Sequence, residues 1–292
     1  MNKQGVVILA LGHAYWGRWA YNLAMSIKFS SPKMPITLLY SDAGKTHIHD
    51  VTFFDKMIEI PPEHYTTNGR ISYLRAKTCI YKLSPYKETV YLDADMIWLP
   101  QTPIDNLFDS LVDVDFTMAN RGFMDLNDED LSDTFGVWAS PKHIKEVFNF
   151  KEGKFYNLSS EMIYFKKKKN IGKLFSDASK YYDDETYNHV YFNGGMPDEL
   201  PFTIAMIKNK IYPHIDNYLP VYWEAATNPP RRLSGAELNA FMAYSMGGHI
   251  PHPTMKKTYN NFVQFYYKKF QKQYPYFWIS KSEGWMPDRK TL

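Results

Sequence analysis

The sequence predicts an α/β fold in which helices flank a mostly parallel central sheet. Short apolar runs rich in Val, Ile, Leu and Tyr alternate along the chain with longer stretches of helical periodicity. Turns that contain glycine or proline separate these segments. The first elements are a strand at residues 6–11, a turn at Gly12 and a helix at 15–29, the order in which nucleotide-binding α/β domains begin.

The next elements continue this alternation up to residue 93. We expect strands at 36–40 and 57–60, a helix at 71–83 and a strand that ends at Asp93. Because a strand, a helix and a strand follow one another here, they predict a parallel crossover. The signature GxGxxG is absent, which argues against a dinucleotide-binding site.

The second half of the chain alternates in the same way. A strand at 115–119 should end at the turn-forming residues 120–122, and an acidic, polar loop should follow at 125–133. The remaining expected elements are strands at 136–140, 158–165 and 241–246, and a strand or extended loop at 218–223. Helices are expected at 141–148, 171–182 and 258–273, with a further helix that follows the segment 192–200 and ends at about residue 209. We expect one domain at 1–255 and a basic, aromatic helical extension at 256–292 that packs on it.

The composition favours a cytoplasmic, soluble protein. The one cysteine among 292 residues, Cys79, cannot form an internal disulfide, which suits a reducing compartment. The chain contains no run of about 18 apolar residues, so the sequence predicts no transmembrane helix. The net charge of +3 neither requires nor excludes an anionic polymer as a partner. Aromatic residues reach 17%, which suits recognition of sugars and also suits protein interfaces.

The most informative motif is Asp93-Ala94-Asp95, which follows one apolar run and precedes another. Ligands of an open α/β sheet bind at the carboxyl ends of its strands, where these carboxylates should lie. Two close carboxylates repel unless a cation lies between them, and hard divalent cations prefer oxygen ligands. The motif therefore predicts a Mn²⁺ or Mg²⁺ site for a substrate that carries phosphate. The alternative is a pair of solvated turn residues.

The run from Tyr91 to Asp95 resembles the metal-binding motif of GT-A glycosyltransferases, and family 8 most of all. That resemblance implies transfer of a sugar, with retention of configuration, from a nucleotide sugar such as a UDP-sugar. It implies that Ala10, Leu11, Gly12 and Tyr15 bind the uracil and ribose, with the tyrosine stacked on the base. Lys77 precedes Asp93 by sixteen residues, as a donor-binding lysine does in glycogenin-like enzymes.

Two further segments carry parts of the resemblance. Asp198 and Glu199 are similar to an Asp-Gln pair of the family, with Glu in place of Gln. The family's Asn-Ser-Gly becomes Ser-Ser-Glu at 159–161, which leaves the sugar contacts of this segment open. Of the family's pattern around its metal-binding histidine, this chain keeps only the His and a later Lys. The histidine would be His249, or His252, and the lysine would be Lys256 or Lys257.

The resemblance also implies a role for each candidate residue. Asp93, Asp95 and His249 would hold Mn²⁺ on the diphosphate, with Ala94 and Gly248 beside the donor. Lys77 and Lys256 would stabilise the leaving group. Asp198 would orient the donor sugar or the acceptor. Each candidate also has a plainer alternative. Tyr15 would be an aromatic side chain packed on the sheet, and Lys77 with Arg75 would lie on a solvated helix face. Asp198 would be a helix N-cap.

The acceptor and the reaction class stay open. A glycan, a protein or a lipid-linked sugar would suit the family, and modified DNA is an alternative. A nucleotidyltransferase would also use Asp-x-Asp and a metal, and a module that only binds carbohydrate or protein would use neither. The aromatic and lysine-rich segment at 259–278 would either lie on an anionic membrane or cover the core as a helix.

Overall fold

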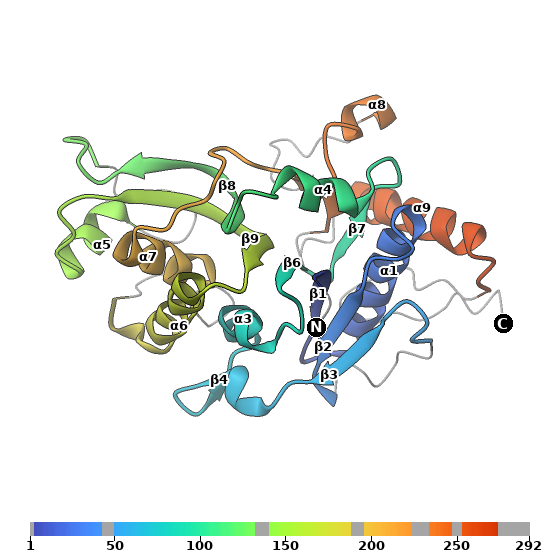
Figure 1. Ribbon diagram of the computed structural model, residues 1–292, viewed down its shortest axis with the longest axis horizontal. Coiled ribbons are helices and arrows are strands. Elements are labelled where there is room, and N and C mark those ends of the chain that lie inside the picture. The colour runs from blue at the N-terminus through green and yellow to red at the C-terminus, as the bar shows by residue number, and fades with distance from the viewer. Residues whose placement is uncertain are drawn as a thin grey trace. The chain divides into compact units, whose positions relative to one another are not determined.

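A computed structural model describes residues 3–42, 50–131, 140–187, 196–223, 234–246 and 253–273 (Figure 1). The chain forms two compact units, each built from several stretches of sequence. Unit 1 contains residues 1–3, 60–91 and 113–219, and unit 2 contains residues 4–59, 92–112 and 220–292. The predicted boundary at residue 255 concerns a different division of the chain and stays a prediction.

Unit 2 holds the N-terminal strands. Strand β1 (Gln4–Ala10) pairs in parallel with β2 (Ile36–Tyr40), which pairs in parallel with β3 (Lys56–Glu59). A second sheet joins β10 (Val221–Trp223) in parallel to β11 (Ala243–Ser245), which runs antiparallel to β7 (Met96–Trp98). All five residues of β2 are buried, so both faces of the strand are covered, as a continuous apolar run predicts for a strand of a parallel sheet.

Two long helices of unit 2 pack on one another and on β7. Helix α1 (Ala14–Ser30) ends just before Pro32, and α9 (Pro253–Lys269) buries Met255, Tyr259, Val263 and Tyr266 along one face. The Tyr266 hydroxyl donates a hydrogen bond of 2.6 Å to the Trp98 carbonyl. The described part of the C-terminal segment therefore covers the core, as one of the two alternatives for it predicts. Helices α4 (Ile104–Ser110) and α8 (Gly235–Leu238) also belong to this unit.

Unit 1 contains the strands β6 (Glu88–Leu92, with its last residue in unit 2), β8 (Phe116–Asp125) and β9 (Lys154–Lys166), in the order β6-β9-β8. Its helices are α3 (Ile80–Leu83), α5 (Pro141–Val147), α6 (Lys169–Asp183) and α7 (Glu199–Asn209). The 3₁₀ helices are η1 (Pro62–His64), η2 (Tyr73–Cys79) and η3 (Glu185–Tyr187), and a small hairpin joins β4 (Thr66–Thr67) to β5 (Arg70–Ile71).

Helices α6 and α7 pack side by side, and α7 lies on β9 (Figure 1). A buried apolar cluster fills the space among α5, α6, α7 and β9; it consists of Leu126, Ile144, Phe155, Tyr182, Tyr187, Met196, Leu200, Ile204 and Ile207. Ser140 caps α5 by accepting a hydrogen bond from the His143 amide, and Pro141 occupies the first turn.

Strand β8 is longer than the sequence predicts. We expected an end at Asn120 to Gly122, yet the strand continues to Asp125 across two irregularities in its register with β9. The Asn120 side chain satisfies the displaced backbone: its carbonyl accepts from the amides of Gly122 and Asn217, and its amide donates to the carbonyls of Met118 and Ile215. The prediction of one continuous helix at 71–83 is also wrong, because η2 and α3 share that range.

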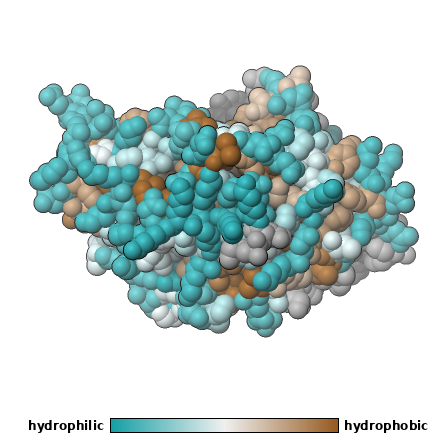
Figure 2. All heavy atoms as spheres, viewed as in Figure 1, coloured by the Kyte–Doolittle hydropathy of each residue, from teal (hydrophilic) through white to brown (hydrophobic). Residues whose placement is uncertain are grey.

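The α/β class and the mostly parallel sheet flanked by helices are confirmed. The face in Figure 2 is mainly hydrophilic, with apolar residues in small, separate groups. Within the described ranges, no helix is both long enough and apolar enough to cross a membrane. The strand predicted at 136–140 lies almost wholly outside the described residues.

Candidate active site

The turn after β1 is fastened to the end of β2. The Ala10 carbonyl accepts a hydrogen bond of 3.2 Å from the Ser41 amide, and the Gly12 amide donates one of 3.1 Å to the Ser41 hydroxyl. Gly12 has φ +84°, a conformation that favours glycine over residues with a Cβ. His13 then caps α1, since its Nδ1 accepts from the Tyr15 amide. The predicted nucleotide-binding residues 10–12 and 15 therefore form one fixed turn.

Tyr15 is packed among aromatic rings at the start of α1. Its ring lies 4.3 Å from that of His13 and 4.7 Å from that of Trp19, measured between centroids. Burial raises the pKa of the Tyr15 hydroxyl, and the negative charge of Asp95 raises it further. The packed arrangement agrees with the plainer alternative for this residue, and stacking on a base stays a prediction.

The Asp-x-Asp motif lies in the turn between β6 and β7. Asp93 is partly exposed, whereas Ala94 and Asp95 are buried. The Asp95 charge also raises the pKa of Tyr259 on α9, although burial is the larger cause there. Asp95 therefore lies near two tyrosines from the two long helices of unit 2, and a role as a freely solvated turn residue is wrong for it.

Strand β11 brings a further segment to Asp95. It pairs antiparallel with β7, so that Ser245 lies opposite Met96. The Met246 amide donates a hydrogen bond of 3.0 Å to the Asp95 carbonyl. This hydrogen bond places Met246, which stands three residues before His249 in the sequence, beside the second aspartate.

The remaining predicted ligands of this region are not all described. Gly248, His249 and His252 lie outside the described residues, so the choice between the two histidines stays a prediction. Lys256 is partly buried near the start of α9. Within the described ranges, no three His, Cys, Asp or Glu side chains form a complete metal site. Two carboxylates one residue apart, one of them buried, nevertheless fit a hard divalent cation.

Lys77 is at the centre of a polar cluster in unit 1. It lies on η2 and is only 7% exposed, so the alternative of a solvated helix face is wrong. Its Nζ lies 3.2 Å from Oδ2 of Asp198 and donates a hydrogen bond of 2.9 Å to the Ser160 hydroxyl. The ammonium group also lies 5.9 Å from the centroid of the Tyr91 ring. Lys77 and Asp198, which the sequence singles out 121 residues apart, are thus brought together.

Asp198 occupies the N-cap position of α7 without capping the helix through its side chain. It is 3% exposed, and among the described residues its Oδ2 atom has no hydrogen bond of good geometry, although the ion pair with Lys77 involves that atom. The side chain is therefore directed to the lysine, and the N-cap alternative holds only for its backbone position.

Sequence reasoning missed one member of this cluster, Ser160, and assigned no role to another, Glu199, although it noted the Asp198-Glu199 pair. The Ser160 hydroxyl donates a hydrogen bond of 3.0 Å to Oε1 of Glu199. Because side chains alternate along β9, Ser160 faces the cluster, whereas the Ser159 hydroxyl donates to Glu161 at 3.2 Å. Burial raises the pKa of Glu199 to about 8, with the neighbouring Asp198 charge as the second cause. The sequence did contain one sign of the role of Glu199, because this acidic residue stands where the family has the neutral amide Gln.

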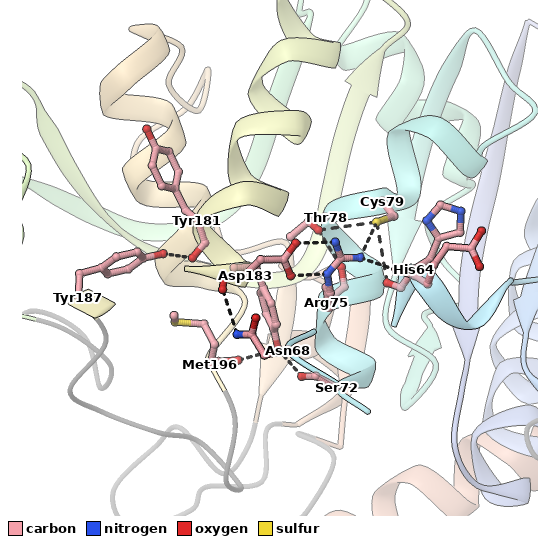
Figure 3. A network of polar contacts seen from close by, with 12 residues as sticks. His64, Asn68, Ser72, Arg75, Thr78, Cys79, Tyr181, Asp183, Tyr187 and Met196 are labelled. Atoms are coloured by element: carbon pink, nitrogen blue, oxygen red, sulfur yellow. Dashed lines mark hydrogen bonds and ion pairs between the residues drawn. The ribbon is translucent and has the colours of Figure 1, made fainter. Parts of the chain in front are cut away.

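A second network on η2 holds this cluster in place (Figure 3). The Arg75 guanidinium donates two hydrogen bonds to the Asp183 carboxylate, at 2.6 and 2.7 Å, and a third of 2.9 Å to the Glu63 carbonyl. It also lies 3.7 Å from the Cys79 sulfur. Arg75 therefore ties η2 to the end of α6 and to η1, and a solvated helix face is wrong for this residue too.

Tyr182 connects the same elements to the segment before α7. Its hydroxyl lies 2.6 Å from the Ser72 hydroxyl and donates a hydrogen bond of 3.0 Å to the Met196 carbonyl. Asp198 follows Met196 by two residues, and the charges of Asp198 and Lys77 both act on the Tyr182 hydroxyl. Tyr182 thus helps to fix the distance between η2 and the start of α7.

Comparisons with solved structures place the fold. The bifunctional glycosyltransferase WbbM matches with a TM-score of 0.56 at 13% identity, over 93% of this chain and 52% of that one. Galactosyltransferase LgtC, in complex with donor and acceptor sugar analogues, matches with a TM-score of 0.56 at 12% identity, over 90% and 95%. An active-site mutant of LgtC, with Glu in place of Gln, matches at 0.52.

This chain spans about half the length of WbbM and nearly all of LgtC. No family model and no curated protein matches the sequence. At 12–13% identity the agreement with these structures concerns the fold. The chain therefore has the fold of GT-A glycosyltransferases, as the resemblance of its motifs implies.

Proposed function

We propose that this protein transfers a glycosyl group from a nucleotide sugar, with a UDP-sugar as the donor, to an acceptor that is a glycan, a protein or a lipid-linked sugar. One observation carries the proposal. In unit 2 the charge of the buried Asp95 acts on Tyr15 at the start of α1, and the Asp95 carbonyl accepts a hydrogen bond from Met246, the residue after β11. Nucleotide-binding and cation-binding groups are expected at such a sheet edge.

Each group has a defined part in this function. Residues 10–12 and Tyr15 bind the uracil and ribose, and Asp93, Asp95 and His249 are suited to hold Mn²⁺ or Mg²⁺. When bound, the cation neutralises charge on the leaving diphosphate. Lys77 adds a fixed positive charge, and Asp198 has a buried acceptor atom suited to a sugar hydroxyl. The family resemblance implies retention of configuration, and we include this in the proposal.

A thermal-shift panel tests the donor site. UDP-sugars and GDP-sugars are compared with and without Mn²⁺, because a ligand that binds only the folded state raises the melting temperature. At a concentration one hundred times its dissociation constant, the matching donor should raise the melting temperature by about 5 °C in the presence of Mn²⁺. The shift should disappear in Asp95→Asn.

Asp109→Asn is the matched control, because Asp109 is an exposed aspartate on α4 of the same unit. It should keep the full shift. A donor shift that persists in Asp95→Asn, or no shift with any nucleotide sugar, contradicts the proposed site. Product analysis separates the reaction classes: release of UDP supports glycosyl transfer, and release of pyrophosphate indicates a nucleotidyltransferase.

A further inference from the structure

The cluster around Lys77 contains one more negative group than positive groups when all its members are ionised. Asp198 and Glu199 are adjacent in sequence, and Lys77 is the cation of the described residues that pairs with them. Like charges that share a poorly solvated site favour retention of one proton. With one proton retained, the cluster of Lys77, Asp198 and Glu199 is neutral.

The contacts indicate which carboxyl group keeps the proton. Asp198 is the direct ion-pair partner of Lys77, at 3.2 Å, so its negative charge is compensated. Glu199 accepts hydrogen bonds from the Ser160 hydroxyl, at 3.0 Å, and from its own backbone amide, and Ser160 in turn accepts from Lys77. Because the serine proton is directed to Oε1 of Glu199, a proton on the glutamate belongs on Oε2.

We infer that Glu199 is a neutral carboxylic acid at pH 7 and donates its Oε2 proton to a hydroxyl or ring oxygen of the bound sugar. This inference rests on the proposed function and adds a positioning residue to it. A neutral acid offers one donor and one acceptor, whereas the neighbouring Asp198 carboxylate offers acceptors only. Glu199 would therefore donate a hydrogen bond to one position of the sugar, whereas Asp198 would accept one from another position.

The electrostatics agree with this assignment. Burial, followed by the charge of Asp198, raises the pKa of Glu199 to about 8, while Lys77 and the Ser160 hydrogen bond oppose the rise. Tyr182 on α6 also faces the cluster, and its pKa is raised, mainly by burial, so that it stays neutral. Tyr91 on β6 is a further neighbour, with its ring centroid 5.9 Å from Nζ of Lys77. Glu199 therefore keeps its proton below about pH 8, and above it the cluster gains a negative charge that disfavours an anionic donor.

Carbon-13 NMR of the full chain, labelled at the glutamate side-chain carboxyl, tests the protonation directly. The Glu199 signal is the one that is missing in Glu199→Gln. We expect it to titrate near pH 8, whereas exposed glutamates titrate near about 4.3. Ser160→Ala removes a hydrogen bond that favours the ionised form, so it should move the Glu199 transition to higher pH. A transition at or below pH 5 overturns the inference.

Donor affinity as a function of pH tests the contact with the sugar. With Mg²⁺ and the UDP-sugar found in the panel, wild-type affinity should fall about tenfold between pH 6.5 and pH 9, because about one acid in eleven remains protonated at the higher pH. Glu199→Gln should reduce this pH-dependent change to less than twofold. The control Glu146→Gln, at an exposed position on α5, should retain it.

The outcomes separate this inference from the proposed function. An equal loss of affinity in wild type and Glu199→Gln overturns the contact between Glu199 and the sugar. If the NMR transition lies near pH 8 and no nucleotide sugar binds at any pH, the proposed function fails and so does the sugar contact. In that case the protonated Glu199 alone would stand.

Discussion

Two ion pairs start from neighbouring positions of η2 and differ in what they leave unsatisfied. Arg75 binds Asp183 through two hydrogen bonds and donates a third to the Glu63 carbonyl. Lys77 lies 3.2 Å from Asp198, and both of these side chains are less than 10% exposed, whereas the Asp183 side chain is 38% exposed. The first pair is matched in number and geometry. In the second pair, the single positive charge of Lys77 faces two carboxyl groups, those of Asp198 and Glu199.

From this difference we expect the Arg75–Asp183 pair to be structural and the Lys77–Asp198 pair to serve the proposed function. The planar guanidinium of Arg75 donates hydrogen bonds to a carboxylate and to a backbone carbonyl, and these bonds fix the relative positions of η1, η2 and α6. A buried ammonium beside two carboxyl groups costs desolvation energy and is retained where charge is needed for function. Substitutions at the two pairs should therefore differ in whether stability or activity suffers more.

Lys77→Met should give the largest effect. It leaves Asp198 buried without its cation, and removal of one partner of a buried pair costs about 3 kcal/mol of the free energy of unfolding. Urea unfolding at pH 7.5 measures this loss. Glycosyl transfer should be lost as well.

The double variant Lys77→Met with Asp198→Asn is the control for the charge argument. It removes both charges, so most of the lost stability should return while activity stays absent. If Lys77→Met lowers the free energy of unfolding by less than 1 kcal/mol, the pair with Asp198 is weaker than its burial implies.

The sequence predicted the elements of this cluster better than its chemistry. Lys77 was found because it precedes Asp93 by sixteen residues, and Asp198 because the Asp198-Glu199 pair resembles the family's Asp-Gln pair. Neither inference used the distance between the two residues in space. The raised pKa of Glu199 depends on burial and on the charge of Asp198, and its carboxyl group is bonded to a serine of β9, 39 residues away; no local pattern contains the burial or the distant contact. The same limit applies to the solvated helix face, which was the plainer alternative for Lys77 and Arg75.

The fold shows the same division between local and distant causes. Strands and helices with clear periodicity were predicted to within a few residues. The end of β8 was not, because Asn120 and Gly122 are turn-forming residues by local preference. Their backbone is satisfied by a segment 95 to 97 residues away, at Ile215 and Asn217. Distant hydrogen bonds of this kind override a turn preference and cannot be deduced from neighbouring residues.

Arg75→Lys should have an intermediate effect and should lower stability more than catalysis. A lysine keeps the charge and loses the paired hydrogen bonds to Asp183, which should cost about 1 to 2 kcal/mol. Urea unfolding and donor kinetics, measured on the same preparation, provide the comparison. Arg70→Lys, at an exposed position of β5, should change stability by less than about 0.5 kcal/mol. A complete loss of transfer with normal stability would place Arg75 in the chemistry.

Tyr182→Phe should have the smallest effect and is the sharpest test of the connection between the two pairs. The ring stays in the apolar cluster, and the variant loses only the contacts to Ser72 and the Met196 carbonyl, at a cost of about 1 kcal/mol. Because those contacts fix the segment that carries Asp198, KM for the donor should rise severalfold while kcat changes little. Tyr181→Phe is the matched neighbour, since the ring of Tyr181 packs against Phe148, and it should leave KM unchanged. An equal rise of KM in both variants would show that α6 as a whole, rather than this hydroxyl, sets the position of Asp198.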